Sequence, residues 1–204
     1  MIRRFDGNAL LIASHNAGKL MEFRQILAPR GITVTGAAEH GLPEPAETET
    51  TFVGNARIKA HAAAQATGLP ALADDSGLEV AALDGAPGVY TADWAETPQG
   101  RDFRQAMAKT HAALLARGAP EPWAARFCCT LVLAWPDGVD AVFEGYAPGH
   151  LVWPPRGIDG HGYDPMFVPH HDQGRTFAEM TAEEKNALSH RGAAISALMQ
   201  GCFE

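Results

Sequence analysis

The chain has 204 residues, enough for one sizeable domain or for two small lobes around a shared cleft. Apolar residues make up 46% of it and charged residues 20%, a globular composition that argues against disorder. The formal net charge of −8 argues against a surface for nucleic acid or anionic membrane, because binding phosphate backbones requires an excess of Lys and Arg. A small phosphorylated ligand stays compatible with this charge, since a bound metal reverses the field locally.

The cysteines and the hydropathy of the chain indicate the cellular compartment of the protein. The three cysteines, Cys128, Cys129 and Cys202, lack metal-ligand spacing, and the vicinal pair lies in an apolar run that predicts core packing. The sequence shows no run of about 18 apolar residues and no signal peptide. We therefore expect a cytoplasmic protein with no membrane association.

The first predicted elements are a strand, a loop and a helix. Residues 9–13 form an apolar run of buried-strand length, and the polar residues 14–19 follow. Apolar residues then recur at helical spacing up to Leu27. A loop that enters a helix presents N–H groups and a positive dipole end, so this loop is a candidate phosphate site, with side-chain donors from Ser, Asn and Lys. It is not a P-loop, because Leu20 follows the lysine.

A second strand is predicted over residues 32–34, and an acidic, Pro-containing loop over residues 43–49 follows it. From Thr51 onward, Phe and Ala residues recur at helical spacing, and Gly68 marks the end of that helix. Its many alanines indicate close packing of the helix against a neighbour.

Residues 72–78, Leu-Ala-Asp-Asp-Ser-Gly-Leu, place two carboxylates and a hydroxyl in a predicted Gly-containing turn. Carboxylates near a core are costly unless a cation meets them. Hard oxygen ligands of this kind suit Mg²⁺, which takes one or two protein carboxylates and completes its shell with water and phosphate oxygens. The alternative is a solvated Asp-Asp-Ser-Gly hairpin turn.

The middle of the chain predicts a helix between Gly100 and Gly118 and then a β-hairpin. Two β-rich runs, residues 126–135 and 139–145, are joined by a Pro-Asp-Gly turn. Residues 151–153 are predicted as a third strand.

The last part of the chain combines a glycine-rich loop and a capped helix. Residues 160–169 join flexible glycines, ring side chains and a carboxylate, a pattern suited to stacking on a planar ligand or to an ordinary structured turn. Thr181 begins a capping box, so a helix starts there. On one straight helix Lys185, His190 and Arg191 face different directions, so either a kink near Ser189 starts a second segment or the three do not serve one site.

Five separated segments together match one enzyme family. They are residues 14–19, residues 51–56 with the Glu47 loop before them, residues 73–78, residues 162–165, and residues 182–186 with 189–192. Each segment is weak alone, but five in order over nearly the whole chain are specific. The chain resembles the inosine triphosphatase family, the dITP/XTP pyrophosphatases that remove non-standard purine nucleotides from the nucleotide pool.

The resemblance implies an α/β fold with a long, mixed, twisted β-sheet, helices on both sides and two lobes around a central nucleotide cleft. It implies one such domain over residues 1–204, usually assembled as a homodimer. The implied reaction is Mg²⁺-dependent hydrolysis between the α- and β-phosphates of a nucleoside triphosphate such as ITP, dITP or XTP, which gives the monophosphate and pyrophosphate.

The resemblance also implies roles for individual residues. Asp75 is implied as the general base and a metal ligand, and Glu47 as the second metal ligand. The implied substrate-binding residues are Ser14, His15, Asn16, Ala17, Gly18, Lys19, Ser76, His161, Gly162, Tyr163, Asp164, Lys185, His190 and Arg191. The lysines and the first loop would hold the triphosphate, and the later residues would frame the base and sugar.

Physical chemistry agrees with these assignments. Attack on a polyphosphate requires neutralised charge and a deprotonated water, which a metal and a carboxylate supply together. Inosine and xanthosine carry an acceptor oxygen at the purine 6-position, and adenosine carries a donor amine there. A donor such as Arg191 would pair with the oxygen but be left unsatisfied by the amine, which disfavours adenosine.

Two positions depart from the family pattern. His15 stands where the family usually has glycine, and His161 stands where it usually has phenylalanine before Gly-Tyr-Asp-Pro. The first imidazole either donates to phosphate or points outward, and the second stacks with less apolar area than phenylalanine.

Two other hypotheses compete with this one. A Maf-like nucleotide pyrophosphatase would act on modified pyrimidines or canonical nucleotides. A regulatory module would bind the nucleotide without releasing pyrophosphate, although Glu47, Asp74, Asp75 and Lys19 are all present. A kinase ranks lower, because the chain has no P-loop.

Overall fold

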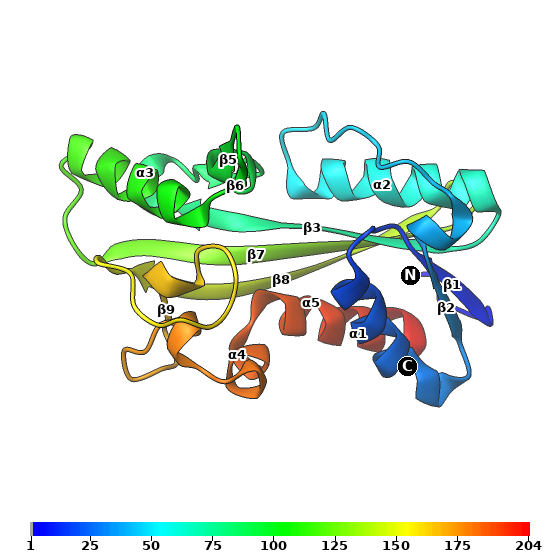
Figure 1. Ribbon diagram of the computed structural model, residues 1–204. Coiled ribbons are helices and arrows are strands. Elements are labelled where there is room, and N and C mark those ends of the chain that lie inside the picture. Colours follow the sequence, from blue (N-terminus) through cyan, green and yellow to red (C-terminus); the bar gives the residue numbers. More distant parts are fainter. Residues whose placement is uncertain (1) are drawn as a thin grey trace. The chain divides into compact units, whose positions relative to one another are not determined.

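The computed structural model describes residues 2–204 (Figure 1). The strands are β1 (Ala9–Ile12), β2 (Thr33–Gly36), β3 (Ala71–Val80), β4 (Pro87–Gly88), β5 (Glu96–Thr97), β6 (Gly100–Arg101), β7 (Trp123–Ala134), β8 (Asp140–Leu151) and β9 (Phe167–Pro169). The helices are α1 (Ala17–Leu27), α2 (Phe52–Thr67), α3 (Phe103–Ala116), α4 (Ala182–Leu188) and α5 (His190–Leu198), the last followed by a π-helical turn. Short 3₁₀ turns connect several of these elements.

The chain forms two compact units, which are described separately. Unit 1 contains residues up to 75 together with 130–144 and 194–204, and unit 2 contains residues 76–129 and 145–193. The strands β3, β7 and β8 contribute residues to both units.

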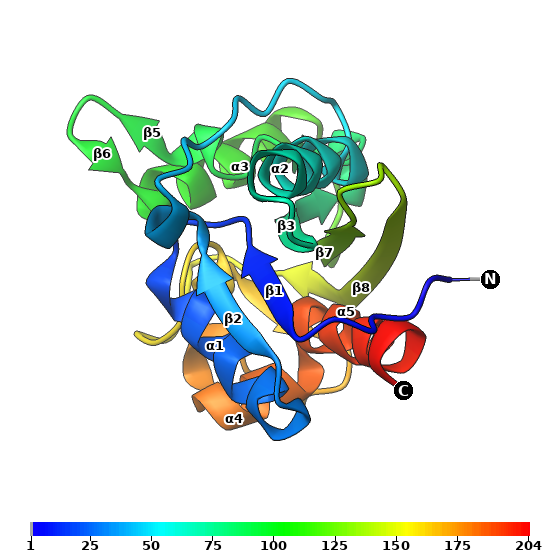
Figure 2. The same ribbon diagram turned by 90° about the vertical axis from the view of Figure 1, so that its right-hand side faces the viewer.

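The main sheet has the order β2-β1-β3-β7-β8-β9, with β4 paired to β3. The β1 strand runs parallel to both β2 and β3, whereas β4 is antiparallel to β3 and β9 is antiparallel to β8. The sheet is therefore mixed, as the family resemblance implies, and a second sheet joins β5 to β6. The connection from β1 to β2 runs in one direction across the sheet, and the connection from β2 to β3 runs back past β1. Right-handed crossovers therefore place α1 and α2 on opposite faces of the sheet, as Figure 2 shows.

In unit 1 local signals fix both helices. The Asn16 side chain caps α1, and the Thr51 hydroxyl accepts a hydrogen bond from the Gly54 N–H and caps α2. Gly68, with φ of 70°, ends α2 in the left-handed conformation that glycine tolerates best. The alanine face of α2 packs on Leu11 and on Val132, which confirms the close approach that its composition predicts.

The core of unit 2 forms between α3 and the sheet. Three rings, Phe127, Phe167 and Phe177, lie within 4.7–6.0 Å of one another between centroids and are at most 7% exposed. The buried Met107 and Leu114 of α3 belong to the same cluster. This packing gives the loop between β8 and β9 a rigid base.

Residues 74–77 do not form the turn that the sequence predicts; they lie inside β3. Before them Leu72 pairs with Ile12 of β1, and after them Leu78 pairs with Gly88 of β4. Ladder partners on both sides of the tetrapeptide keep its backbone extended. Asp-Asp-Ser-Gly favours a turn locally, and pairing with neighbouring strands overrides that preference.

The third strand predicted at residues 151–153 is also wrong, because Leu151 is the last residue of β8. Gly149 pairs with Pro169 and Leu151 with Phe167, so the hairpin strand continues past the glycines that appeared to end it. The predicted hairpin itself is confirmed, with longer strands.

The C-terminal helical region is broken at Ser189, which confirms the kink that the sequence left open. Ser189 is extended, with ψ of 150°, after α4 and before α5. Its hydroxyl accepts a hydrogen bond from the Gly192 N–H at 3.0 Å, which caps the second segment. His190 and Arg191 therefore begin a new helix.

The cysteines pack in the interior. All three are buried and free. Burial raises the pKa of Cys128 to about 12 and that of Cys202 to about 11, so both remain thiols at neutral pH. Within residues 2–204, no helix is long and apolar enough to cross a membrane.

Close packing at Gly149 gives a stability prediction. A Cβ at this position would lie 2.2 Å from the Val168 carbonyl oxygen and 2.6 Å from the Phe167 ring. We expect Gly149→Ala to lower the free energy of unfolding by about 1–3 kcal/mol, as overpacking does. Urea denaturation measures this loss. Gly7→Ala is the control, because its Cβ would meet only the Phe5 ring, at 3.2 Å and more; equal stability of both variants would contradict the prediction.

Candidate active site

The loop of residues 14–19 is organised around Asn16. Its side-chain oxygen accepts hydrogen bonds from the Gly18 and Lys19 N–H groups, at 2.9 and 3.1 Å. The Ser14 hydroxyl accepts a hydrogen bond from the Asn16 N–H at 3.1 Å. Two of the N–H groups expected to attract phosphate are thus held by the loop itself. The helix dipole and the side-chain donors of Asn16 and Lys19 are what the loop offers an anion.

Lys19 forms an ion pair with Asp74 on β3. The ammonium donates to both carboxylate oxygens at 2.8 and 2.7 Å, and the Asp74 side chain is only 8% exposed. This pair compensates the cost of burying the carboxylate. Asp75, also buried, is the next residue of the strand and points to the other face of the sheet. The two adjacent carboxylates therefore have different surroundings.

Glu47 lies in the acidic loop and is held from α2. The Lys59 ammonium donates to its carboxylate at 2.5 Å, and the Lys59 side chain is only 12% exposed. One turn earlier on the same helix face, the Asn55 side-chain oxygen accepts a hydrogen bond from the Glu49 N–H at 2.9 Å. The sequence analysis gave no role to Lys59 or to Asn55, although Asn55 lies in one of the matched segments. Their i, i+4 spacing on an otherwise alanine-rich face is the signal that finds them.

His15 contacts the same acidic loop. Its Nε2 lies 2.9 Å from the carbonyl oxygen of Leu42. The imidazole that departs from the family pattern thus has a partner within unit 1, and its role as a phosphate donor stays a prediction.

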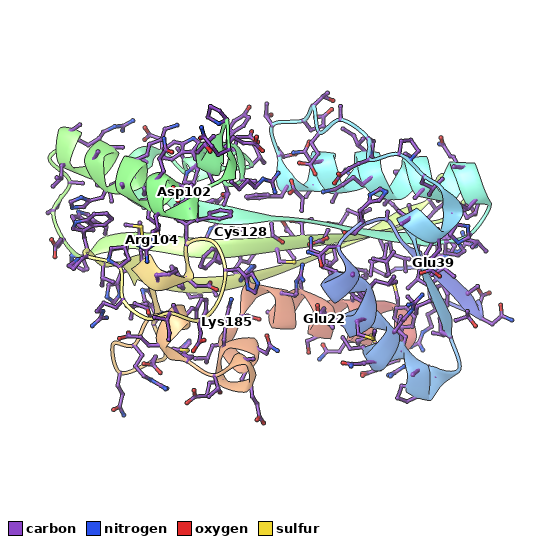
Figure 3. All side chains as sticks on the ribbon, in the orientation of Figure 1. Glu22, Glu39, Asp102, Arg104, Cys128 and Lys185 are labelled. Atoms are coloured by element: carbon purple, nitrogen blue, oxygen red, sulfur yellow. The ribbon has the colours of Figure 1, made fainter. Side chains whose placement is uncertain are left out.

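In unit 2 the site residues gather around Asp164. This carboxylate is 2% exposed, accepts a hydrogen bond from the His161 N–H at 2.6 Å and forms an ion pair with Lys185 of α4. Lys185 is labelled in Figure 3. At Gly160 a Cβ would meet Asp164 at 2.3 Å, and φ is +81°, so the loop requires glycine there. The structure thereby brings His161, Asp164 and Lys185 together.

The two rings of this loop have different environments. Tyr163 is buried beside Phe103, with ring centroids 5.9 Å apart, and burial raises its pKa to about 12. His161 is exposed and borders a hollow of about 730 Å³ that Phe103 and Trp153 also line. Of the two, His161 is therefore the ring available to a ligand, and Tyr163 supports the loop from below.

The remaining predicted residues also occupy defined places. Ser76 lies on β3, directly after Asp75. His190 begins α5 and stacks on Phe127, with centroids 5.0 Å apart and ring planes 16° from parallel. Arg191 follows it on the same helix. The kink at Ser189 sets the direction of both side chains.

The acidic side chains of the candidate site determine which metal ion it could hold. Within residues 2–204, no group of three or more His, Cys, Asp or Glu side chains could hold a metal ion. A zinc site needs three or four such protein ligands. Mg²⁺ needs only one or two carboxylates and takes its other ligands from water and phosphate. Asp75 and Glu47 are oxygen donors of the kind that suits Mg²⁺.

Known proteins resemble this chain over its whole length. The model of the Ham1 family matches residues 10–201. A dITP/XTP pyrophosphatase from Ruegeria pomeroyi is 66% identical over 203 residues, covering 100% of this chain and 99% of that protein. One from Gluconobacter oxydans is 54% identical and covers 100% and 96%. The structure of a HAM1 protein from Coxiella burnetii has a TM-score of 0.88 at 40% identity, covering 95% of this chain and 98% of that one.

The ion pair between Asp164 and Lys185 gives the prediction of this section. Asp164→Asn keeps an acceptor for the His161 N–H but removes the charge that Lys185 faces. We expect the free energy of unfolding to fall by about 1–3 kcal/mol, the cost of losing a hydrogen bond between charged groups. Thermal denaturation measures it. Asp159→Asn is the control, because that exposed side chain makes no ion pair within residues 2–204; a loss of equal size there would refute the assignment.

Proposed function

We propose, from the premise that the chain belongs to the Ham1 family, that it is a nucleoside triphosphate pyrophosphatase that hydrolyses ITP, dITP and XTP to the monophosphate and pyrophosphate. The observation that carries the proposal is the arrangement in unit 1. There the candidate phosphate loop is joined through Lys19 to β3, the strand that bears Asp75. The names of the similar proteins, dITP/XTP pyrophosphatases, support the same activity and its substrates.

The proposal includes Mg²⁺ as cofactor. Asp75 and Glu47 are the residues that would hold it. When bound, such an ion neutralises phosphate charge and lowers the pKa of coordinated water. The fit of a two-carboxylate donor set to Mg²⁺ supports this part of the proposal.

The chain's own groups then have distinct roles. Asp75 accepts the proton of the attacking water, because its neighbour Asp74 is already neutralised by Lys19. Ser14, Asn16, Lys19 and Lys185 bind phosphate oxygens and stabilise charge on the leaving pyrophosphate. The ammonium of Lys19 makes two hydrogen bonds to Asp74, so its position is set before phosphate arrives.

Base recognition is assigned to the exposed His161, to its loop and to the beginning of α5. His161 stacks on the purine, while Arg191 or a backbone N–H donates to the 6-oxygen. Facing adenine, the same donor would be left unsatisfied, and this mismatch in a dry site costs enough to reject ATP. The rigid support of the loop by Asp164 favours this selectivity.

We further propose that the enzyme works as a cytoplasmic homodimer and contributes to cleansing of the nucleotide pool. The family resemblance supports this assembly and this role.

The role of Asp75 is tested by Asp75→Asn, which keeps the size of the side chain but removes its basicity and charge. We expect the turnover number for ITP to fall at least ~10²-fold, because a general base contributes that much, while the circular dichroism spectrum stays unchanged. Glu79→Gln is the control, since Glu79 lies on the same strand and pairs with Arg126. Full activity of Asp75→Asn would remove Asp75 from the mechanism.

Substrate selection is tested by measuring pyrophosphate release from ITP, XTP, GTP and ATP in parallel, with Mg²⁺ and with a chelator. We expect Mg²⁺-dependent release from ITP and XTP, and release at least about tenfold slower from ATP, whose 6-amine leaves the donor unsatisfied. We also expect release at least about tenfold slower from GTP; because guanine shares the 6-oxygen, its rejection requires a further feature near the purine 2-position. Equal release from all four would show that the base site is misassigned. Binding of ITP without release from any would indicate a binding module instead.

A further inference from the structure

The chemistry of its partner shows that His15 is the donor in its hydrogen bond. The Leu42 carbonyl oxygen only accepts hydrogen bonds, so the His15 Nε2, 2.9 Å away, carries a proton and donates. The contact joins residues 27 positions apart in the sequence. It ties the candidate phosphate loop to the beginning of the acidic loop that carries Glu47.

The acidic loop connects Leu42, which accepts the hydrogen bond from His15, to Glu47. Pro43 and Pro45 follow Leu42, and each fixes its own φ, which removes two of the backbone dihedral angles between Leu42 and Glu47. At the other end Lys59 holds the Glu47 carboxylate at 2.5 Å. Glu47 therefore lies between an anchor on α2 and an anchor on His15.

Packing alone does not hold the loop in place. A cavity of about 150 Å³ lies between it and α2, lined by His15, Leu42, Pro43, Pro45 and alanines of the helix. Side chains that border this open space have no protein atoms to pack against on that side. The position of the loop consequently depends on its polar anchors more than it would over a filled core.

We propose that His15 is a positioning residue for the metal site: by holding the Leu42 carbonyl, it sets the place of the Glu47 carboxylate and thereby the affinity for a divalent cation. This inference rests on the proposed function in assigning Glu47 to the metal. It assigns a function to the His15 imidazole, which stands at a position where the family usually has glycine. The ring acts on the acidic loop, and phosphate is bound by its neighbours.

Three substitutions separate the hydrogen bond from the bulk of the ring. In His15→Gln the amide nitrogen is as many bonds from Cα as the His Nε2, so it reaches the Leu42 carbonyl. In His15→Asn the nitrogen is one bond too short, and His15→Gly has no donor. His40→Asn is the matched control, because His40 is also an exposed histidine of unit 1, and its Nε2 contacts the Thr35 hydroxyl at 2.8 Å rather than the acidic loop.

Two measurements need no turnover: hydrogen exchange of the amides of residues 44–50, and the dissociation constant for Mn²⁺ alone, read by electron paramagnetic resonance. We expect His15→Asn and His15→Gly to exchange faster in this segment and to bind Mn²⁺ about tenfold more weakly, as loss of a supporting contact to a metal ligand does. His15→Gln and His40→Asn should stay within about twofold of the parent. The KM for ITP at saturating Mg²⁺ should be unchanged in the control His40→Asn.

Unchanged exchange and Mn²⁺ affinity in His15→Asn and His15→Gly would overturn the inference, as would a His15→Gln variant no better than His15→Gly. A higher KM for ITP with normal Mn²⁺ affinity would assign His15 to phosphate instead. The proposed function fails separately, if the parent protein releases no pyrophosphate, since the exchange and Mn²⁺ measurements do not depend on catalysis.

Discussion

The burial of two adjacent carboxylates in β3 is the constraint on which the candidate site depends. Alternation along a strand sends the Asp74 and Asp75 side chains to opposite faces, so one cation cannot serve both. Lys19 compensates Asp74 through two hydrogen bonds, and this pair fixes the beginning of α1 relative to the strand within unit 1. Asp75 is thereby distinguished from its neighbour by its surroundings, and the proposed function assigns the general base to it.

Ion pairs with a lysine also occur at two other candidate site residues. Lys59 neutralises Glu47, and Lys185 neutralises the buried Asp164. In both cases a lysine on a helix holds a carboxylate from elsewhere in its own unit. For Asp164, which is 2% exposed, the pairing offsets the cost of burial. Phosphate binding by lysines already placed in this way needs less ordering of side chains than binding by free ones. The arrangement suits an enzyme for small polyanions despite a net charge of −8.

Local signals predicted much of the fold. Capping residues gave the beginnings of α2 and α4, Gly68 gave an end, and the Pro-Asp-Gly turn gave the β7–β8 hairpin. The errors occurred where strand pairing overrides local preference. Asp-Asp-Ser-Gly reads as a turn, yet it is extended in β3 because β1 and β4 pair on either side of it. For the same reason β8 continues through Gly149 to its pairing with β9.

By itself the sequence determined the family, the fold class and the order of the candidate site segments, because these depend on residue identity and spacing along the chain. Only the tertiary structure decided the partner of each of these polar groups: Lys19 with Asp74, Lys59 with Glu47, and His15 with the Leu42 carbonyl. These partners are 12 to 55 residues apart. No local pattern encodes such a pairing, since the packing of helices on the sheet is what brings the two members together.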